Sequence, residues 1–293
     1  MAKLHEQKKR FTCLKSKCVK RVISMNRLSW NVKRICNKLF ANMPYVKGKM
    51  ITKYKSIEWV SYGDSITSSN GWQPAVAEKL GLTHLNRGIG GTTIAENGSI
   101  AWIDKNGNYK GHPPDIQPKG TTEILSSMCN SQRINATIPL TTQLLTIMGG
   151  TNDFGRNIPL GNGLPTNKHL NLDESTFTGA LCSMVEKIQL RLPDCRIILM
   201  TPVPRYHEGK YEDKNKAGFL TSDYARAVKD VASFYSLPCI DLYSNVGWNR
   251  MNGEYYLIDS MHPNNTKGYK RVSEIVIGEL EVLQQNVNSK IKD

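Results

Sequence analysis

Most of the fold of this 293-residue chain follows from one stretch, Ile57-Glu58-Trp59-Val60-Ser61-Tyr62-Gly63-Asp64-Ser65-Ile66-Thr67. Its first half is mostly large or β-branched and predicts a short strand, which runs into a glycine turn. A serine on a sharp turn from strand to helix is held away from the sheet with its Oγ exposed, as a nucleophile requires. Gly-Asp-Ser also occurs in ordinary turns, where Asp and Ser bond nearby backbone. The stretch alone therefore favours a structural turn, and the rest of the chain must decide.

After this stretch, short apolar strands alternate with helices. Further strands are predicted at 82–86, 142–148, 195–200 and 238–242, and helices at 71–81, 121–134, 173–192 (with Asp173 as N-cap), 222–236 and 267–283. Near-continuous apolar strands alternating with helices are typical of a parallel sheet covered by helices on both faces. In such sheets ligands bind at the carboxyl ends of the strands. The loops that follow the strands are therefore the candidate site.

Residues 96–120 form a long, polar, turn-rich insertion after the second predicted strand. Such a segment is uncommon in a compact domain unless it shapes a binding site. Trp72, Trp102 and Tyr206 are candidate substrate contacts, although aromatic side chains there could equally cover the sheet edge. His112, within the insertion, is expected to be a solvated loop residue.

Four short motifs lie after predicted strands or just before the last helix. They are Gly63-Asp64-Ser65, Gly90-Gly91, Asn152 and Asp259-Ser260-Met261-His262. Acyl transfer from a serine requires a base for the hydroxyl proton, and a histidine such as His262 can take it. Asp259 can hold the other ring nitrogen in one tautomer. A glycine N–H and an asparagine amide can donate to the oxyanion of the tetrahedral intermediate.

These motifs resemble the four conserved blocks of the SGNH hydrolase superfamily, the GDSL-type esterases and acylhydrolases. The blocks read here as Gly63-Asp64-Ser65-Ile66, Asn86-Arg87-Gly88-Ile89-Gly90-Gly91, Gly150-Thr151-Asn152-Asp153 and Asp259-Ser260-Met261-His262, in the family's order. The resemblance implies Ser65 as nucleophile and His262 as base, supported by Asp259. It also implies an oxyanion hole made by the backbone N–H of Ser65 together with Gly91 and Asn152, and chemistry without a metal or organic cofactor.

The resemblance further implies a flavodoxin-like three-layer α/β/α sandwich with a five-stranded parallel sheet, which agrees with the predicted strands. Gly91 is preferred to Gly90 because the family's oxyanion glycine falls five residues after the asparagine of its block. Ile66 stands where the family has leucine, a mild departure. No second glycine completes a G-x-S-x-G motif around Ser65, which argues against an α/β-hydrolase.

The N-terminal segment 1–50 differs from the body 51–293 in charge. It holds 14 Lys and Arg and one acid, so it carries +13 of the chain's formal charge of +14. Within it, residues 22–40 have the pattern of a basic amphipathic helix. We expect an arm that docks on a protein assembly, a second copy or an anionic surface; nucleic acid is not favoured, because no nucleic-acid-binding motif is present. No transmembrane segment is predicted.

The expected function is a serine esterase that removes acetyl or another short acyl group from a carbohydrate. The alternatives are a lipid-directed acylhydrolase, such as a lysophospholipase or thioesterase, and a non-catalytic module of an assembly. Seven cysteines without a C-x-x-C pair read as reduced core residues. Because no export signal is evident, we expect a cytoplasmic protein or one carried in an assembly such as a phage virion.

Overall fold

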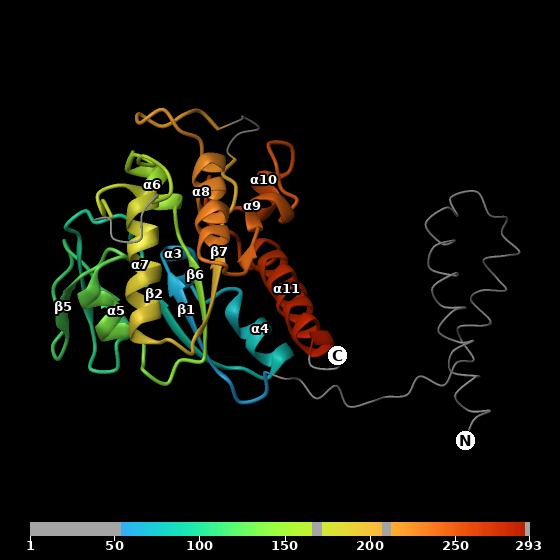
Figure 1. The fold of residues 1–293 in the computed structure, drawn as a ribbon. Coiled ribbons are helices and arrows are strands. Elements are labelled where there is room, and N and C mark those ends of the chain that lie inside the picture. The colour runs from blue at the N-terminus through green and yellow to red at the C-terminus, as the bar shows by residue number, and fades with distance from the viewer. Residues whose placement is uncertain (1–53, 166–171, 207–211, 291–293) are drawn as a thin grey trace, which may run out of the picture. The chain divides into compact units, whose positions relative to one another are not determined.

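The central sheet has five parallel strands in the order β2-β1-β6-β7-β8. The computed structural model describes residues 54–165, 172–206 and 212–290 (Figure 1), so the predicted basic segment 1–50 lies outside them. The strands are β1 Glu58–Gly63, β2 Thr83–Gly88, β6 Leu144–Met148, β7 Arg196–Met200 and β8 Cys239–Ile240. In chain order the arrangement is 2-1-3-4-5, the flavodoxin-like order. The expected five-stranded parallel sheet is confirmed.

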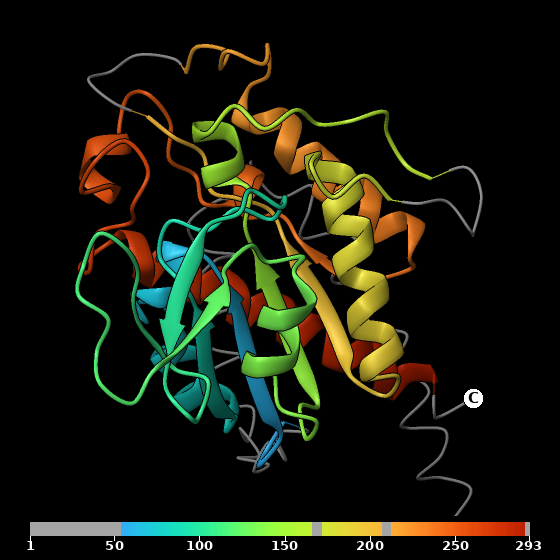
Figure 2. The same cartoon turned by 90° about the vertical axis from the view of Figure 1, so that its left-hand side faces the viewer.

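Long helices cover both faces of this sheet (Figures 1 and 2). They are α7 Phe177–Arg191 and α8 Thr221–Phe234 on one face, and α4 Gln73–Leu80 and α11 Gly268–Lys290 on the other. Alternate residues of a strand point to opposite faces. In β6, Leu145 and Ile147 join the core under α7 and α8, whereas Leu144 and Met148 join the core under α4 and α11. The result is the predicted three-layer sandwich.

Short helices cluster where the strands end. They are α3 Ser65–Ser68 after β1, α6 Thr151–Gly155 after β6, α9 Leu242–Asn245 after β8, and α10 Gly253–Tyr256. Three of the four begin within three residues of a strand's carboxyl end, which is where such sheets bind ligands. None of the described helices is long and apolar enough to cross a membrane.

Residues 96–120 were expected to be irregular. Instead they supply two strands of a second, antiparallel sheet in the order β4-β3-β5. Its strands are β3 Ile100–Ile103, β4 Tyr109–Gly111 and β5 Thr122–Leu125. The helix predicted at 121–134 is therefore wrong over residues 121–130, where β5 pairs with β3 and buries Ile124 in a small core. Helix α5, Ser131–Thr137, starts after Asn130, whose side chain accepts from the Gln132 N–H.

Two further expectations are tested by local structure. Helix α7 begins at Phe177 with Thr176 as its N-cap, so the predicted start at Asp173 is wrong. Asp173 instead accepts from the N–H of Ser175 in the turn before the helix. The four cysteines among the described residues are free and buried or half-buried, as expected for reduced core positions; they are Cys129, Cys182, Cys195 and Cys239.

Candidate active site

Ser65 stands at the start of α3, immediately after β1 and its glycine. A Cβ at Gly63 would lie 2.5 Å from the carbonyl oxygen of Met148 and 2.3 Å from Thr67 Oγ1, so only glycine lets β1 and α3 approach this closely. Asp64 caps α3, because its Oδ1 accepts from the Ile66 N–H at 3.0 Å. Burial raises the pKa of Asp64 to about 6, against the opposing hydrogen bond from Ile66 and the nearby cationic groups. The turn therefore presents Ser65 and turns Asp64 inward.

A hydrogen-bonded chain joins three of the predicted residues. Ser65 Oγ lies 2.8 Å from His262 Nε2, and His262 Nδ1 lies 2.8 Å from Asp259 Oδ2. Ser65 and His262 are 197 positions apart in sequence. With Nδ1 donating to the carboxylate, Nε2 is free to accept the serine proton, which is the arrangement that a base-activated nucleophile needs.

Asp259 is held by its own loop. Its second oxygen, Oδ1, accepts from the backbone N–H groups of Met261 at 2.8 Å and of His262 at 2.7 Å. Burial acts to raise the pKa of Asp259, but the hydrogen bonds from the backbone and ring of His262 and from Met261 outweigh it, and the pKa lies below its ordinary value. Asp259 is therefore ionised near neutral pH and fixes the imidazole orientation.

The sheet register brings the two predicted oxyanion loops to either side of Ser65. Gly63 pairs with Gly88 of β2 on one side and with Met148 of β6 on the other. Gly91 thus follows one neighbouring strand and Asn152 follows the other. Because parallel strands end at the same edge, all three loops lie at one edge of the sheet.

Both loops have donors available. Ser65 is the first residue of α3, where a backbone N–H has no partner within the helix. Gly91 has a φ of +72°, and its N–H donates to no other described residue. Asn152 Nδ2 donates to the Thr92 carbonyl at 2.9 Å, which uses one of its two N–H groups and ties the loops together. The remaining donors are those that an oxyanion hole requires.

Asp153 connects the same two loops through buried hydrogen bonds. It is fully buried, and its carboxylate accepts from the N–H groups of Ile94 and Ala95, each at 3.0 Å. Burial raises the pKa of Asp153 to about 7, although both hydrogen bonds oppose the shift. The segment after Gly91 is thereby fastened to the residue next to Asn152.

Arg133 of α5 is a second brace, and nothing in its sequence context signalled it. Its guanidinium is fully buried and donates to the carbonyl of Gly63 at 2.6 Å and to Thr92 Oγ1 at 2.9 Å. It also stacks over the Tyr62 ring, with 4.5 Å between the guanidinium carbon and the ring centroid. Burial lowers the pKa of Arg133, while the nearby Tyr62 and Asp64 act to raise it. One side chain thus connects the nucleophile turn with the Gly91 loop.

The three aromatic residues expected to contact substrate differ in how far they are buried. Trp72 is 1% exposed and packs on Trp59 in the core beneath α4 and α11, and Trp102 is 4% exposed within the insertion. Both rings are therefore buried by protein in this structure and expose little surface to the site. Tyr206 is half-buried, and its backbone N–H donates to the Ser260 carbonyl at 3.2 Å, beside the His262 loop. It is the one of the three that borders the site.

A pocket of about 390 Å³ opens beside the candidate oxyanion loop. Its walls come from the Gly91 loop, the insertion and the end of α6, and include Ser99, His112 and Arg156. The expectation that His112 is merely a solvated loop residue is therefore incomplete. Arg156 was missed, although it lies only three residues after the block that contains Asn152.

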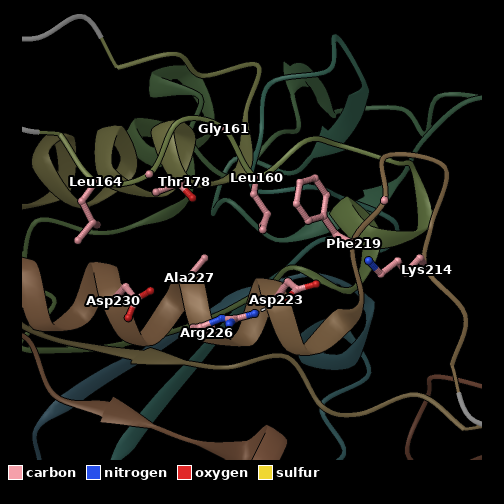
Figure 3. Close-up of a pocket in the computed structure, with 12 residues that line it drawn as sticks. Leu160, Gly161, Leu164, Thr178, Lys214, Phe219, Asp223, Arg226, Ala227 and Asp230 are labelled. Atoms are coloured by element: carbon pink, nitrogen blue, oxygen red, sulfur yellow. Dashed lines mark hydrogen bonds and ion pairs between the residues drawn. The ribbon is translucent and has the colours of Figure 1, made fainter.

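A second pocket, of about 440 Å³, lies between α8 and the loop that precedes α7 (Figure 3). Leu160, Leu164 and Phe219 face Arg226 and Asp230 of α8 across it. None of the residues of the Ser65 chain or of the two oxyanion loops lines this pocket. The larger hollow is therefore separate from the candidate catalytic residues.

A hydrogen-bonded Ser-His-Asp chain at the carboxyl edge of a flavodoxin-like sheet is the catalytic arrangement of a serine hydrolase, here on an α/β fold. Residues 61–271 match the GDSL-like Lipase/Acylhydrolase family, and the chain belongs to that family. The protein is accordingly a hydrolase of carboxylic ester bonds.

Solved structures share this fold at low sequence identity. A protein from Lactobacillus plantarum is 22% identical with a TM-score of 0.60, over 78% of this chain and 98% of that one. A possible lipase from Chitinophaga pinensis is 19% identical with a TM-score of 0.54, over 78% and 99%. A variant of an acetyl-xylooligosaccharide esterase from Geobacillus Stearmophilus is 19% identical with a TM-score of 0.50, over 78% and 96%. Comparison with curated proteins gives no match.

Proposed function

We propose that the protein is a serine esterase that removes acetyl or another short acyl group from a carbohydrate through an acyl-enzyme. The observation that carries the mechanism is the hydrogen-bonded chain from Ser65 through His262 to Asp259. Ser65 Oγ attacks the ester carbonyl while His262 Nε2 takes its proton, and Asp259 stabilises the resulting imidazolium. The oxyanion accepts from the N–H groups of Ser65 and Gly91 and from the Asn152 amide.

Collapse of the tetrahedral intermediate breaks the bond between the carbonyl carbon and the alcohol oxygen. His262 returns its proton to the leaving alcohol, so Ser65 is left acylated and the imidazole is neutral. Water then adds to the acyl-enzyme with His262 again as base, and the acid leaves as Ser65 recovers its proton. No redox step or second substrate besides water is needed.

The preference for a short acyl group on a sugar is supported by the pocket beside Gly91. Its lining is mostly polar or glycine, with Ser99, His112 and Arg156 among its walls, rather than a continuous apolar surface for a long chain. One protein of the same fold acts on acetylated xylooligosaccharides. Both observations fit a deacetylase of carbohydrates.

The test is a panel of acetylated sugars and medium-chain lipid esters, assayed with the wild type and with Ser65→Ala. We expect the wild type to release acetate from acetylated sugars and the variant to be inactive. Equal rates in both proteins, or none in either on any ester, would remove the catalytic proposal and leave a non-catalytic module.

One observation favours the lipid-directed alternative. Met251, Tyr255 and Ile258, which precede Asp259 in the same loop region, are 76%, 56% and 70% exposed. Exposed apolar side chains near a catalytic loop can contact an acyl chain or a lipid surface. Higher kcat/KM for medium-chain lipid esters than for acetylated sugars would select this alternative.

We also propose that the basic segment 1–50 docks the enzyme on a larger assembly, such as a phage virion, and that the protein works in the cytoplasm or on that assembly. The support is the concentration of +13 charge in this segment, while residues 51–293 form a compact unit of their own. Deleting residues 1–50 should abolish incorporation and leave esterase turnover intact. Lost turnover with unchanged incorporation would contradict the proposal, and salt-sensitive DNA binding by the full chain would point to nucleic acid instead.

A further inference from the structure

The pocket beside Gly91 has a composition that the proposed deacetylation does not by itself explain. Its walls are Gly90–Thr92 after β2, Gly98–Ile100 at the start of β3, His112–Pro113 after β4, Ser126 after β5, and Arg156 after α6. Its volume of about 390 Å³ falls within the range of about 300 to 1,000 Å³ that small-molecule pockets occupy. A group seated there would be next to the glycine proposed to bind the oxyanion, so the pocket adjoins the reacting ester.

Charge is the distinguishing property of this pocket. Among the described residues, no Asp or Glu lines it, and Arg156 contributes a guanidinium. Arg156 donates to the Gly91 carbonyl at 3.0 Å and approaches Ser99 Oγ at 3.5 Å, and it makes no ion pair with a carboxylate among the described residues. A guanidinium has five N–H donors, so these contacts fix its position and leave others for a ligand.

Arg205 shows what a compensated arginine looks like in the same neighbourhood. It lies against the Phe154 ring, donates to the Thr151 carbonyl at 3.2 Å, and has Glu212 at 3.9 Å. Burial lowers the pKa of Arg205, and Glu212 and Asp259 act to raise it. The charge of Arg205 is thus paired within the protein, whereas the charge of Arg156 is available to an anionic ligand in the pocket.

His112 adds a second donor to the same pocket. Its Nδ1 is hydrogen-bonded to the hydroxyl of Tyr109 on β4. When the phenol donates, the ring proton resides on Nε2, which leaves an N–H for a ligand. The insertion therefore does more than cover the sheet edge, because it brings a polar wall opposite Arg156.

We propose that this pocket binds the carboxylate of an acidic sugar, so that the substrate is an acetylated uronic acid residue rather than a neutral sugar. This inference rests on the proposed function: an acetyl group carries no charge, so an anion at Arg156 must belong to the alcohol part of the ester. A carboxylate matches the planar guanidinium and can accept two of its N–H groups. Arg156 would select substrate through binding and take no part in proton transfer.

The kinetic test uses a matched pair of substrates, an acetylated methyl glucuronide and the acetylated methyl glucoside, with the wild type, Arg156→Gln and Arg156→Lys. We expect the wild type to prefer the uronide in kcat/KM, and Arg156→Gln to reduce that preference about 10- to 100-fold, the usual effect of losing a hydrogen bond to a charged group. Arg156→Lys should restore part of it. Arg226→Gln, which removes one positive charge at the separate pocket, should keep the preference.

Arg156 also donates to the Gly91 carbonyl, so its loss will lower kcat/KM for both substrates. The ratio of kcat/KM for the uronide to kcat/KM for the glucoside therefore separates recognition of the carboxylate from positioning of the loop. An equal fall for uronide and glucoside would show that Arg156 only positions the oxyanion loop and would overturn the proposal. So would a wild type without preference.

A binding measurement separates this inference from the catalytic proposal. Titration calorimetry of Ser65→Ala with each substrate should show tighter binding of the uronide, and the double variant Ser65→Ala/Arg156→Gln should lose that difference. Equal affinities would overturn the subsite whatever the turnover result. Charge-dependent binding by a protein that hydrolyses no ester would instead refute the esterase proposal and leave the subsite standing.

Discussion

Two pockets among the described residues differ in the groups that surround their arginines. In the pocket between α8 and the loop before α7, Arg226 pairs with Asp223 on the same helix, and Lys214 and Asp230 complete a balanced set of two positive and two negative groups. In the pocket beside Gly91, Arg156 lies with hydroxyls, a histidine and backbone, and no carboxylate of the described part of the chain lines the wall. Where the lining is described, the charges of the pocket between α8 and the loop before α7 balance, whereas the charge of Arg156 in the pocket beside Gly91 has no opposite partner.

The two pockets are similar in volume, so their position and their charged groups distinguish them better than their size does. The pocket of about 440 Å³ lies away from the Ser65 chain, whereas the pocket of about 390 Å³ adjoins the oxyanion loop. The smaller pocket also lies above buried polar braces, Asp153 and Arg133, which hold its wall in place. Burying such groups is costly unless they are satisfied, so their position marks the edge that must keep its geometry.

The largest expected effect comes from Ser65→Ala. Without the nucleophile, kcat on a chromogenic acetyl ester should fall by about 10⁴- to 10⁶-fold, because the serine and its base act as a unit. Thr178→Ala, which trims a hydroxyl at the other pocket, should leave kcat within about twofold. A kcat that stays near the wild-type value in Ser65→Ala would show that another residue is the nucleophile. The pocket beside Gly91 could then no longer be distinguished from the other pocket by its position next to the catalytic serine.

Asn152→Ala should have the next largest effect. Removing one oxyanion donor should lower kcat by about 10²- to 10³-fold with a smaller change in KM, since the amide acts on charge that develops in the transition state. Steady-state kinetics provides the measurement, and Asn162→Ala, in the loop that borders the second pocket, is the matched amide control. A change confined to KM would make Asn152 a ground-state contact instead.

Asp153 predicts a pH dependence of stability. Its pKa is about 7 in the folded protein and about 4 in an unfolded chain, so the native state binds the extra proton between these values. Its contribution to the free energy of unfolding is therefore fully present below about pH 4 and is lost as the pH rises toward about 7. Denaturant unfolding of the wild type and Asp153→Asn at pH 4.5, 6.0 and 7.5 measures this directly.

As the pH rises across that window, the free energy of unfolding of the wild type should fall relative to that of Asp153→Asn by roughly a few kcal/mol. A difference that stays constant with pH would mean that Asp153 keeps an ordinary pKa and is not the proton-binding brace described above. Activity need not follow the same curve, because Asp153 touches backbone and not substrate.

The smallest effect belongs to Arg226→Gln. Its side chain is 66% exposed and its ion pair with Asp223 spans three residues of one helix, so the change should cost no more than about 0.5 kcal/mol. Thermal unfolding and kcat/KM for the acetylated sugars should both stay near the wild-type values. A marked fall in kcat/KM would show that the second pocket also takes part in substrate binding.

Local sequence patterns predicted the framework well, for identifiable reasons. The strand before Ser65 and the helix that ends at Gly81, whose φ is +72°, have short-range signals that tertiary contacts reinforced. The helix prediction was wrong at residues 122–125 because a four-residue segment has no intrinsic preference strong enough to exclude a helix. Its strand partner, β3, lies some 20 residues away in the sequence. The burial of Trp72 and Trp102 could not be predicted locally, because it depends on neighbours that pack from distant parts of the chain.

Local sequence patterns were enough to predict the five parallel strands in chain order, the turn that carries Ser65, and His262 and Asp259 as its hydrogen-bonded partners. They also proposed Asn152 as an oxyanion donor. Those follow from periodicity, turn chemistry and motif residues, which are local. Tertiary contacts decided the second sheet, the burial of Arg133 and Asp153 beneath the loops, and the lack of an ion pair between Arg156 and any carboxylate of the described residues. These depend on which distant side chains meet, because charge compensation and burial are set by neighbours in space, whereas short motifs are set by neighbours in the chain.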